Sequence, residues 1–255
     1  MKAIWMRWLI PAVLGKKLRT ACVGLVMLVV VHPWHAASDE PSPLRFAPIP
    51  MSSKAHMTQQ YLPFLDDLET HTGQRYELAY HARYTDLLDS FAADEIDFAY
   101  LGPLPYVALT ERINHATPVA QFLDSAGEVS YTCSLVAFAG HQGTLATLRR
   151  GAGRIALTQP LSTCGYLMVN REIERRIGQS LESYPYAYTG SHDAVALGVI
   201  MDDFALGGMK TLIAEEYHHL GLRVLAESAP VPGFLLVANA RTVSPATIEA
   251  IKTRL

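Results

Sequence analysis

The chain has 255 residues, half of them hydrophobic, and a formal net charge of −3 at pH 7. This length is ample for a packed core and is typical of one or two domains. The charge shows none of the basic excess of nucleic-acid-binding proteins, so no nucleic-acid partner is expected.

The N-terminus has the pattern of a secretory signal. Basic residues come first, an apolar run covers 21–31, and no acidic residue appears before Asp39. Small residues then allow cleavage after Ala36 or Ala37, which predicts a signal peptide over 1–37 and export of the rest. An uncleaved N-terminal membrane anchor is the alternative, although the apolar run is short for a membrane-spanning helix.

A polar linker at 38–43 leads into alternating strand and helix patterns. Ser52 or Ser53 is expected to cap the first helix, Gly73 to close it, and Pro63 to kink or restart it. The other elements predicted in this half are strands at 44–48, 76–80, 96–101 and 118–122, and helices at 85–93 and 104–112.

The second half repeats the alternation, which is typical of α/β units with parallel strands. Turns at the carboxyl ends of such strands predict a binding cleft between two lobes. The expected strands lie at 131–139, 154–157, 184–188, 204–208, 222–227 and 234–238. The expected helices lie at 144–150, at 162–177, after Ser191, before Leu220 and from Ser244.

Two of these helix starts carry the residue types of an anion site. Ser162 and Thr163 open one helix, and Ser191 followed by His192 opens the next. The first N–H groups of a helix lack intrahelical partners and lie at the positive end of its dipole. Ser and Thr also begin many helices simply as caps, so each segment alone has a structural explanation. Together they suggest one small acidic ligand.

The cysteines leave two readings open. Cys22 lies in the expected signal, so Cys133 and Cys164 remain as an even pair. They form either a disulfide in an oxidising compartment or two buried thiols. No His/Cys cluster has metal-ligand spacing, so no metal or cofactor is expected.

Five segments match a known family in order and spacing across 44–255. They are 61–69 (YLPFLDDLE), the segment around Tyr84, 96–103 (IDFAYLGP), 162–166 (STCGY) and 190–193 (GSHD). Together they resemble the periplasmic solute-binding proteins of ABC importers for phosphonate, phosphite and phosphate.

The resemblance implies a two-lobed α/β fold of the type 2 periplasmic-binding-protein kind. Each lobe would be a mainly parallel sheet flanked by helices, with hinge strands between the lobes. Lobe 1 would comprise 44–132 plus 232–255, and lobe 2 would comprise 133–231.

The implied function is capture of a small oxyanion in an interlobe cleft, in the periplasm, for an ABC permease in the membrane. No enzymatic activity and no cofactor are implied. In lobe 2 the ligand-binding residues would be Ser162, Thr163, Cys164, Ser191, His192 and Asp193. In lobe 1 they would be Ser52, Tyr61, Tyr84, Tyr100 and Leu101.

Several positions depart from the family pattern. Cys164 stands where many relatives have a second Ser or Thr, and Leu101 where the residue can be aromatic. Asp193 stands where a binder of aminoalkylphosphonates has Glu, and Ala205 where relatives commonly have Asp. The phosphoryl half of the implied site is therefore retained and the amine half weakened, which predicts a ligand without an amino group.

Two other functions are compatible with the sequence. A periplasmic sensing domain would use the same fold with a separate signalling protein. An enzyme would use Cys164 as nucleophile and His192 as base. Against the enzyme, Asp193 directly follows His192, and adjacent helix residues do not face each other.

Overall fold

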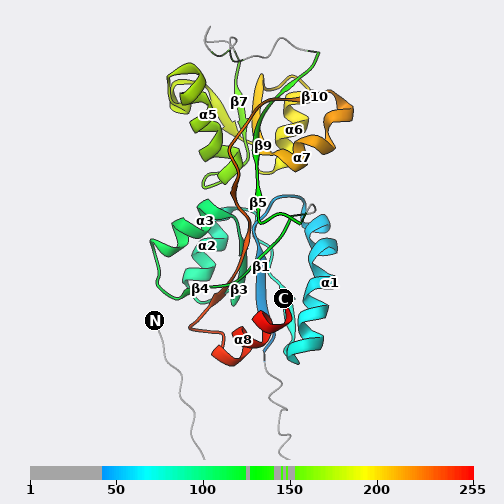
Figure 1. The fold of residues 1–255 in the computed structure, drawn as a ribbon, viewed down its shortest axis with the longest axis vertical. Helices are drawn as coiled ribbons and strands as arrows, with labels where there is room; N and C mark the ends of the chain where they lie inside the picture. The colour runs from blue at the N-terminus through cyan, green and yellow to red at the C-terminus, as the bar shows by residue number, and fades with distance from the viewer. Residues whose placement is uncertain (1–41, 125–126, 141–144, 146–147, 149–152) are drawn as a thin grey trace, which may run out of the picture. The chain divides into compact units, whose positions relative to one another are not determined.

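The computed structural model describes residues 42–255, apart from 125–126, 141–144, 146–147 and 149–152 (Figure 1). The expected signal peptide over 1–37 lies outside the described residues, as does most of the helix expected over 144–150. Within the described ranges, no helix has the length and apolar character needed to cross a membrane.

The first of two five-stranded sheets contains the N-terminal strands and one strand from the end of the chain. Its order is β2 (Tyr76–Leu78), β1 (Leu44–Pro48), β3 (Phe98–Leu101), β12 (Leu235–Asn239) and β4 (Ala116–Gln121). β1 is parallel to β2 and β3, whereas β12 is antiparallel to both of its neighbours. Four strands therefore run one way, and β12 runs against them.

In the second sheet, too, four strands run in one direction and one strand runs against them. Its order is β10 (Leu222–Glu227), β6 (Cys133–Phe138), β9 (Leu206–Lys210), β7 (Ile155–Leu157) and β8 (Tyr186–Tyr188). β7 is parallel to β8 and β9, whereas β6 is antiparallel to β9 and β10. β6 and β12 are the strands that the chain enters without a helical crossover, which explains why they oppose the rest.

Two short strands link the sheets. β5 (Ser130–Tyr131) leads toward β6, β11 (Val231–Pro232) leads back toward β12, and the two pair antiparallel with Tyr131 opposite Val231. The sequence pattern predicted one strand over 131–139, but the structure divides it at Thr132. Thr132 instead accepts a hydrogen bond from the backbone N–H of Thr211 (3.0 Å).

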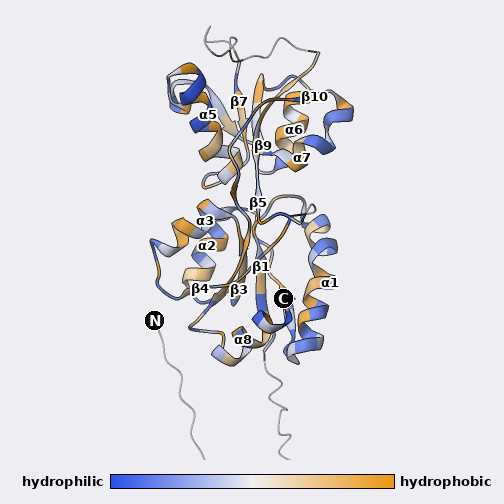
Figure 2. Ribbon diagram, viewed as in Figure 1, coloured by the Kyte–Doolittle hydropathy of each residue, from blue (hydrophilic) through white to orange (hydrophobic). Residues whose placement is uncertain are grey.

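Helices flank both sheets, and Figure 2 shows hydrophobic and hydrophilic residues alternating along helices such as α1. α1 (Lys54–Thr72) is capped by Ser53 and closed by Gly73, as expected, but it runs through Pro63 as one helix. The other helices at the first sheet are α2 (Tyr84–Ala92), α3 (Pro103–Thr110) and α8 (Pro245–Arg254). Those at the second sheet are η1 (Thr163–Leu167), α5 (Met168–Ile177), η2 (Leu181–Ser183), α6 (His192–Ile200), α7 (Thr211–Glu216) and η3 (His218–Leu220).

Asn239 fixes the end of the first sheet. It is fully buried, and its Nδ2 lies 3.3 Å from the carbonyl oxygen of Phe91 and 3.1 Å from Oδ1 of Asp94. Its Oδ1 accepts the backbone N–H of Arg241 at 3.0 Å. Asp94 has φ +62°, a backbone conformation that is unfavourable for a residue other than glycine. The side chain of Asn239 therefore stabilises the turn at Asp94.

We expect Asn239→Ala to lower the free energy of unfolding by roughly 2 to 4 kcal/mol, because it leaves buried backbone groups without partners. Urea denaturation of the variant and of the wild type measures the difference. Asn114→Ala, at an exposed position, is the control and should change stability little. An Asn239→Ala variant as stable as this control would contradict the assigned role.

Candidate functional site

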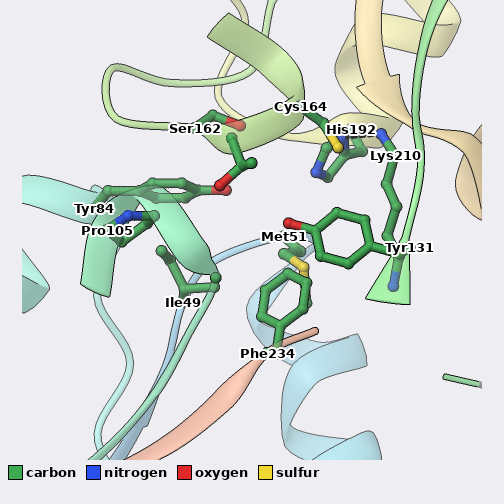
Figure 3. A pocket seen from close by; sticks show the side chains of 12 residues that line it. Ile49, Met51, Tyr84, Pro105, Tyr131, Ser162, Cys164, His192, Lys210 and Phe234 are labelled. Carbon is green, nitrogen blue, oxygen red and sulfur yellow. Dashed lines mark hydrogen bonds between the residues drawn. The ribbon is translucent and has the colours of Figure 1, made fainter. Parts of the chain in front are cut away.

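One pocket is lined by residues that follow strands of both sheets, by residues of the flanking helices, and by the segments that link the sheets (Figure 3). It holds about 280 Å³ free of protein atoms, its open mouth included. The polar side chains that line it are Tyr84, Tyr131, Ser162, Thr163, His192 and Lys210. The apolar side chains are those of Ile49, Met51, Pro105 and Phe234, together with Cys164.

The Ser162 turn lies at the carboxyl end of β7. Ser162 is buried and caps the helix, its Oγ accepting the N–H of Gly165 at 2.9 Å. The helix expected here begins with a π-helical turn, in which the carbonyl of Ser162 accepts the N–H groups of both Tyr166 and Leu167. A Cβ on Gly165 would overlap the side chain of Thr158, so only glycine allows this approach. The turn therefore presents the early N–H groups of a helix to the pocket.

Thr163 and Tyr84 connect the two walls of the pocket. Oγ1 of Thr163 accepts the backbone N–H of Leu104, in the first turn of α3, at 3.1 Å. The phenol of Tyr84 lies beside Ser162, and burial raises the pKa of Tyr84 to about 12 against the opposing effect of the Ser162 hydroxyl. Burial likewise raises the pKa of Tyr131, with the Thr163 hydroxyl opposing. Both phenols therefore stay neutral and keep a proton to donate.

His192 lies in the first turn of α6, directly after its cap Ser191. Its Nδ1 accepts the backbone N–H of Lys210 at 3.3 Å, which leaves the proton on Nε2. Burial, and secondly the charge of Lys210, lower the pKa of His192 to about 4. At neutral pH the ring is therefore an uncharged donor.

Lys210 is the last residue of β9, immediately before α7. Its Nζ lies 5.0 Å from the ring centroid of Tyr131 and 5.3 Å from that of Phe234. Burial lowers the pKa of Lys210, and the charge of Asp124 opposes this shift. Within the described ranges, Lys210 is the one lysine or arginine that lines this pocket.

Sequence reasoning missed Lys210, Tyr131 and Phe234. A signal for Lys210 was present, because β9 is parallel to β7 and runs from glycines directly into a helix. The carboxyl ends of β7, β8 and β9 meet at the same edge of the sheet, so a third strand-to-helix junction was to be expected there. Tyr131 and Phe234 come from the linking segments, whose pairing no sequence pattern revealed.

The structure brings Ser162, Thr163, Cys164, His192 and Tyr84 to the pocket and leaves the other expected residues outside its lining. Tyr61 and Tyr100 pack on each other at 5.6 Å, and Leu101 is fully buried in the core. Ser52 precedes the cap of α1, and Ser191 caps α6 by accepting the N–H of Ala194. Asp193 accepts a hydrogen bond from the Tyr217 hydroxyl at 3.1 Å.

Cys164 forms a disulfide with Cys133, with 4.9 Å between the Cα atoms. This resolves the choice between a disulfide and two thiols. Cys164 therefore has no S–H group to offer a ligand, although the resemblance places it among the ligand-binding residues. The thiol that an enzymatic use of Cys164 requires is absent for the same reason.

The chain matches the model of a protein family described as periplasmic substrate-binding proteins of ABC phosphonate transporters, over residues 46–255. It is 25% identical over 236 residues to the phosphate-import protein PhnD of Mycolicibacterium smegmatis, covering 85% of this chain and 72% of that relative.

Many solved structures share the fold, among them the following two. The binding protein component of a Pseudomonas aeruginosa ABC phosphonate transporter is 21% identical, with a TM-score of 0.73 over 83% of this chain and 72% of that one. PhnD1 of Prochlorococcus marinus in complex with methylphosphonate is 16% identical, with a TM-score of 0.72 over 83% of this chain and 82% of that one. These similarities confirm the α/β, periplasmic-binding-protein-like fold. With the family model covering most of the described chain, the protein belongs to the periplasmic substrate-binding proteins of ABC phosphonate transporters.

Proposed function

We propose that this pocket captures a small phosphorus oxyanion of the phosphonate, phosphite or phosphate type. The observation that carries the proposal is the concentration of donors on one wall: the helix start at Ser162, the hydroxyl of Thr163, and the neutral ring of His192. No carboxylate lines the pocket among the described residues. Such a wall suits a tetrahedral anion, because fixed N–H and O–H dipoles hold its oxygens without large rearrangement.

The opposite wall supports a ligand with a small non-ionic substituent. Ile49, Met51 and Pro105 line this side and offer only apolar surface. An oxyanion facing the donors would direct a methyl group or a hydrogen atom on phosphorus toward these apolar residues. The relatives agree with this class, since one is named for phosphate import and another was solved with methylphosphonate.

We infer that the two sheets form two lobes, 44–132 plus 232–255 and 133–231, which close on the ligand about the segments that contain β5 and β11. The protein would be exported by its N-terminal signal and would deliver the ligand to an ABC permease. Nothing in the described residues favours the sensing alternative.

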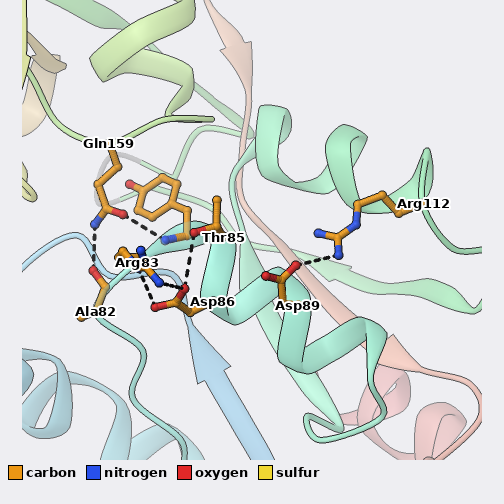
Figure 4. A network of polar contacts seen from close by, with 8 residues as sticks. Ala82, Arg83, Thr85, Asp86, Asp89, Arg112 and Gln159 are labelled. Carbon is orange, nitrogen blue, oxygen red and sulfur yellow. Dashed lines mark hydrogen bonds and ion pairs between the residues drawn. The ribbon is translucent and has the colours of Figure 1, made fainter.

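Gln159 would stabilise the closed arrangement (Figure 4). It follows β7, and its Oε1 accepts the backbone N–H of Tyr84 at 2.9 Å. Its Nε2 donates to the carbonyl oxygens of Ala82 at 3.1 Å and of Gly190 at 2.7 Å. This one side-chain amide thus joins the segment that opens α2, from Ala82 to Tyr84, to the turn at Gly190 that follows β8 of the second sheet.

We expect Thr163→Ala to weaken the binding of methylphosphonate by roughly 1.5 to 3 kcal/mol, through loss of a hydrogen bond to a charged oxygen. Isothermal titration calorimetry measures the loss. Thr163→Ser keeps the hydroxyl and should recover most of the affinity, and Thr70→Ala on the exposed face of α1 should leave it unchanged. Full affinity of the Thr163→Ala variant for methylphosphonate would contradict the proposed site.

We expect Gln159→Glu to destabilise the closed state, because a carboxylate can accept from Tyr84 but cannot donate to the two carbonyl groups. Affinity for methylphosphonate should fall by about tenfold or more, a net loss of about 1.4 kcal/mol. Small-angle scattering at a fixed, subsaturating ligand concentration should give a larger radius of gyration than for wild type. Gln60→Glu, at an exposed site on α1, is the matched control. Equal affinity and equal radius in both variants would refute the role of Gln159.

The low pKa of His192 predicts a pH-dependent stability. Above the ordinary value of 6.5 the ring is neutral in both the folded and the unfolded state. As the pH falls through 6.5, only the unfolded state binds the proton, so the free energy of unfolding decreases until the folded ring titrates near pH 4. This contribution amounts to roughly 3 kcal/mol between pH 7 and pH 4.

Urea denaturation of wild type and of His192→Asn across this range isolates the effect, because asparagine can still accept the N–H of Lys210. The decrease on acidification should be smaller in His192→Asn. His56→Asn, at an exposed position, should follow the wild type. Parallel curves for wild type and His192→Asn would show that the ring is not held neutral.

A further inference from the structure

Lys210 lines the pocket and has no ion-pair partner among the residues that the structure describes. It lines the pocket together with Thr163 and His192, and its half-buried side chain lies against the rings of Tyr131 and Phe234 (Figure 3). Among the described residues, no carboxylate lies within ion-pair distance of its Nζ. The ammonium group therefore sits in a poorly solvated place that an anion would improve.

A second pocket shares Tyr131, Lys210 and Phe234 with the first. Its lining includes Asp124 and Glu128, the carboxylates that lie beyond Lys210. The charge of Asp124 acts on Lys210 and favours its ammonium form. Because Tyr131, Lys210 and Phe234 line both pockets, the lysine lies between the donor wall and these carboxylates.

The positions from which the sequence predicted a ligand without an amino group do not act in the pocket. Asp193 is engaged by Tyr217, and Ala205 packs beside the core of the second sheet. Selection against an amine would therefore need another physical cause, and the positive charge of Lys210 in the pocket is a candidate.

We propose that Lys210 sets the charge specificity of the pocket: its ammonium group pairs with a phosphorus dianion and repels ligands that carry an ammonium group of their own. This inference rests on the proposed function, since it assumes that the oxyanion binds at the donor wall. Opposite charges in a partly desolvated site attract more strongly than in water, and like charges are repelled in the same measure. The preferred class is thus the dianionic alkylphosphonates and their inorganic analogues, not the aminoalkylphosphonates.

The test compares methylphosphonate with 2-aminoethylphosphonate by calorimetry at pH 7.5 and low salt. Wild type should bind methylphosphonate at least about tenfold more tightly. In Lys210→Gln, methylphosphonate binding should weaken by about tenfold or more, and the ratio of the two affinities should fall to within about threefold. Lys210→Arg keeps the charge and should keep the preference. Lys252→Gln, at an exposed site on α8, is the control for removing a lysine.

Circular dichroism verifies that each variant folds. Should Lys210→Gln fail to fold, Lys210→Met offers an unbranched apolar chain to the rings of Tyr131 and Phe234 and gives the same expectation. An unchanged affinity ratio in a folded Lys210→Gln or Lys210→Met variant would overturn the inference, as would tighter wild-type binding of 2-aminoethylphosphonate.

Thr163→Ala separates failure of this inference from failure of the proposed function. If Thr163→Ala weakens both ligands while Lys210→Gln leaves their ratio unchanged, the pocket binds oxyanions but Lys210 does not select them. If both variants keep full affinity, or wild type binds neither ligand, the proposed function fails and this inference with it.

Discussion

The antiparallel pairing of β5 with β11 is the constraint on which the pocket depends. Each strand has only two residues, so the pair cannot form a core of its own and must be stabilised by what packs against it. Tyr131 supplies that packing, with its ring centroid 5.3 Å from that of Phe234. Phe234 in turn stacks on Tyr100 of the first sheet at 4.9 Å. The contacts that hold the linking strands in register thus also form the aromatic wall on which Lys210 rests.

The pocket divides its chemistry between the two sheets. Donors come from the carboxyl ends of β7, β8 and β9, where parallel strands bring successive helix starts to one edge. Apolar surface comes from the segment after β1 and from α3. The proposed tetrahedral ligand with one non-ionic substituent would match this division, because its charged oxygens and its substituent would point in different directions.

Local patterns predicted most of the elements, because strands and helices with one buried face follow hydrophobic periodicity. Ser162, Thr163 and His192 were also predictable, since a polar residue at a helix start has a recognisable local context. Tyr61 and Tyr100, which the resemblance placed in the site, pack against each other from α1 and β3, and Tyr100 lines the second pocket.

Lys210, Tyr131 and Phe234 were missed for a different reason. Their place in the pocket follows from the pairing of distant segments, which periodicity within one segment does not encode. The break at Thr132, which separates β5 from β6, depends in the same way on a contact with Thr211.

Because of the disulfide between Cys133 and Cys164, part of the pocket is ordered during folding and not at the moment of ligand binding. Cys133 begins β6, the first strand of the second sheet, and Cys164 lies in the π-helical turn beside Ser162. The covalent bond removes conformational freedom from the 31-residue span before any ligand arrives. Oxidative folding therefore includes part of the entropy loss of ordering the turn at Ser162, which lines the pocket as a preorganised surface.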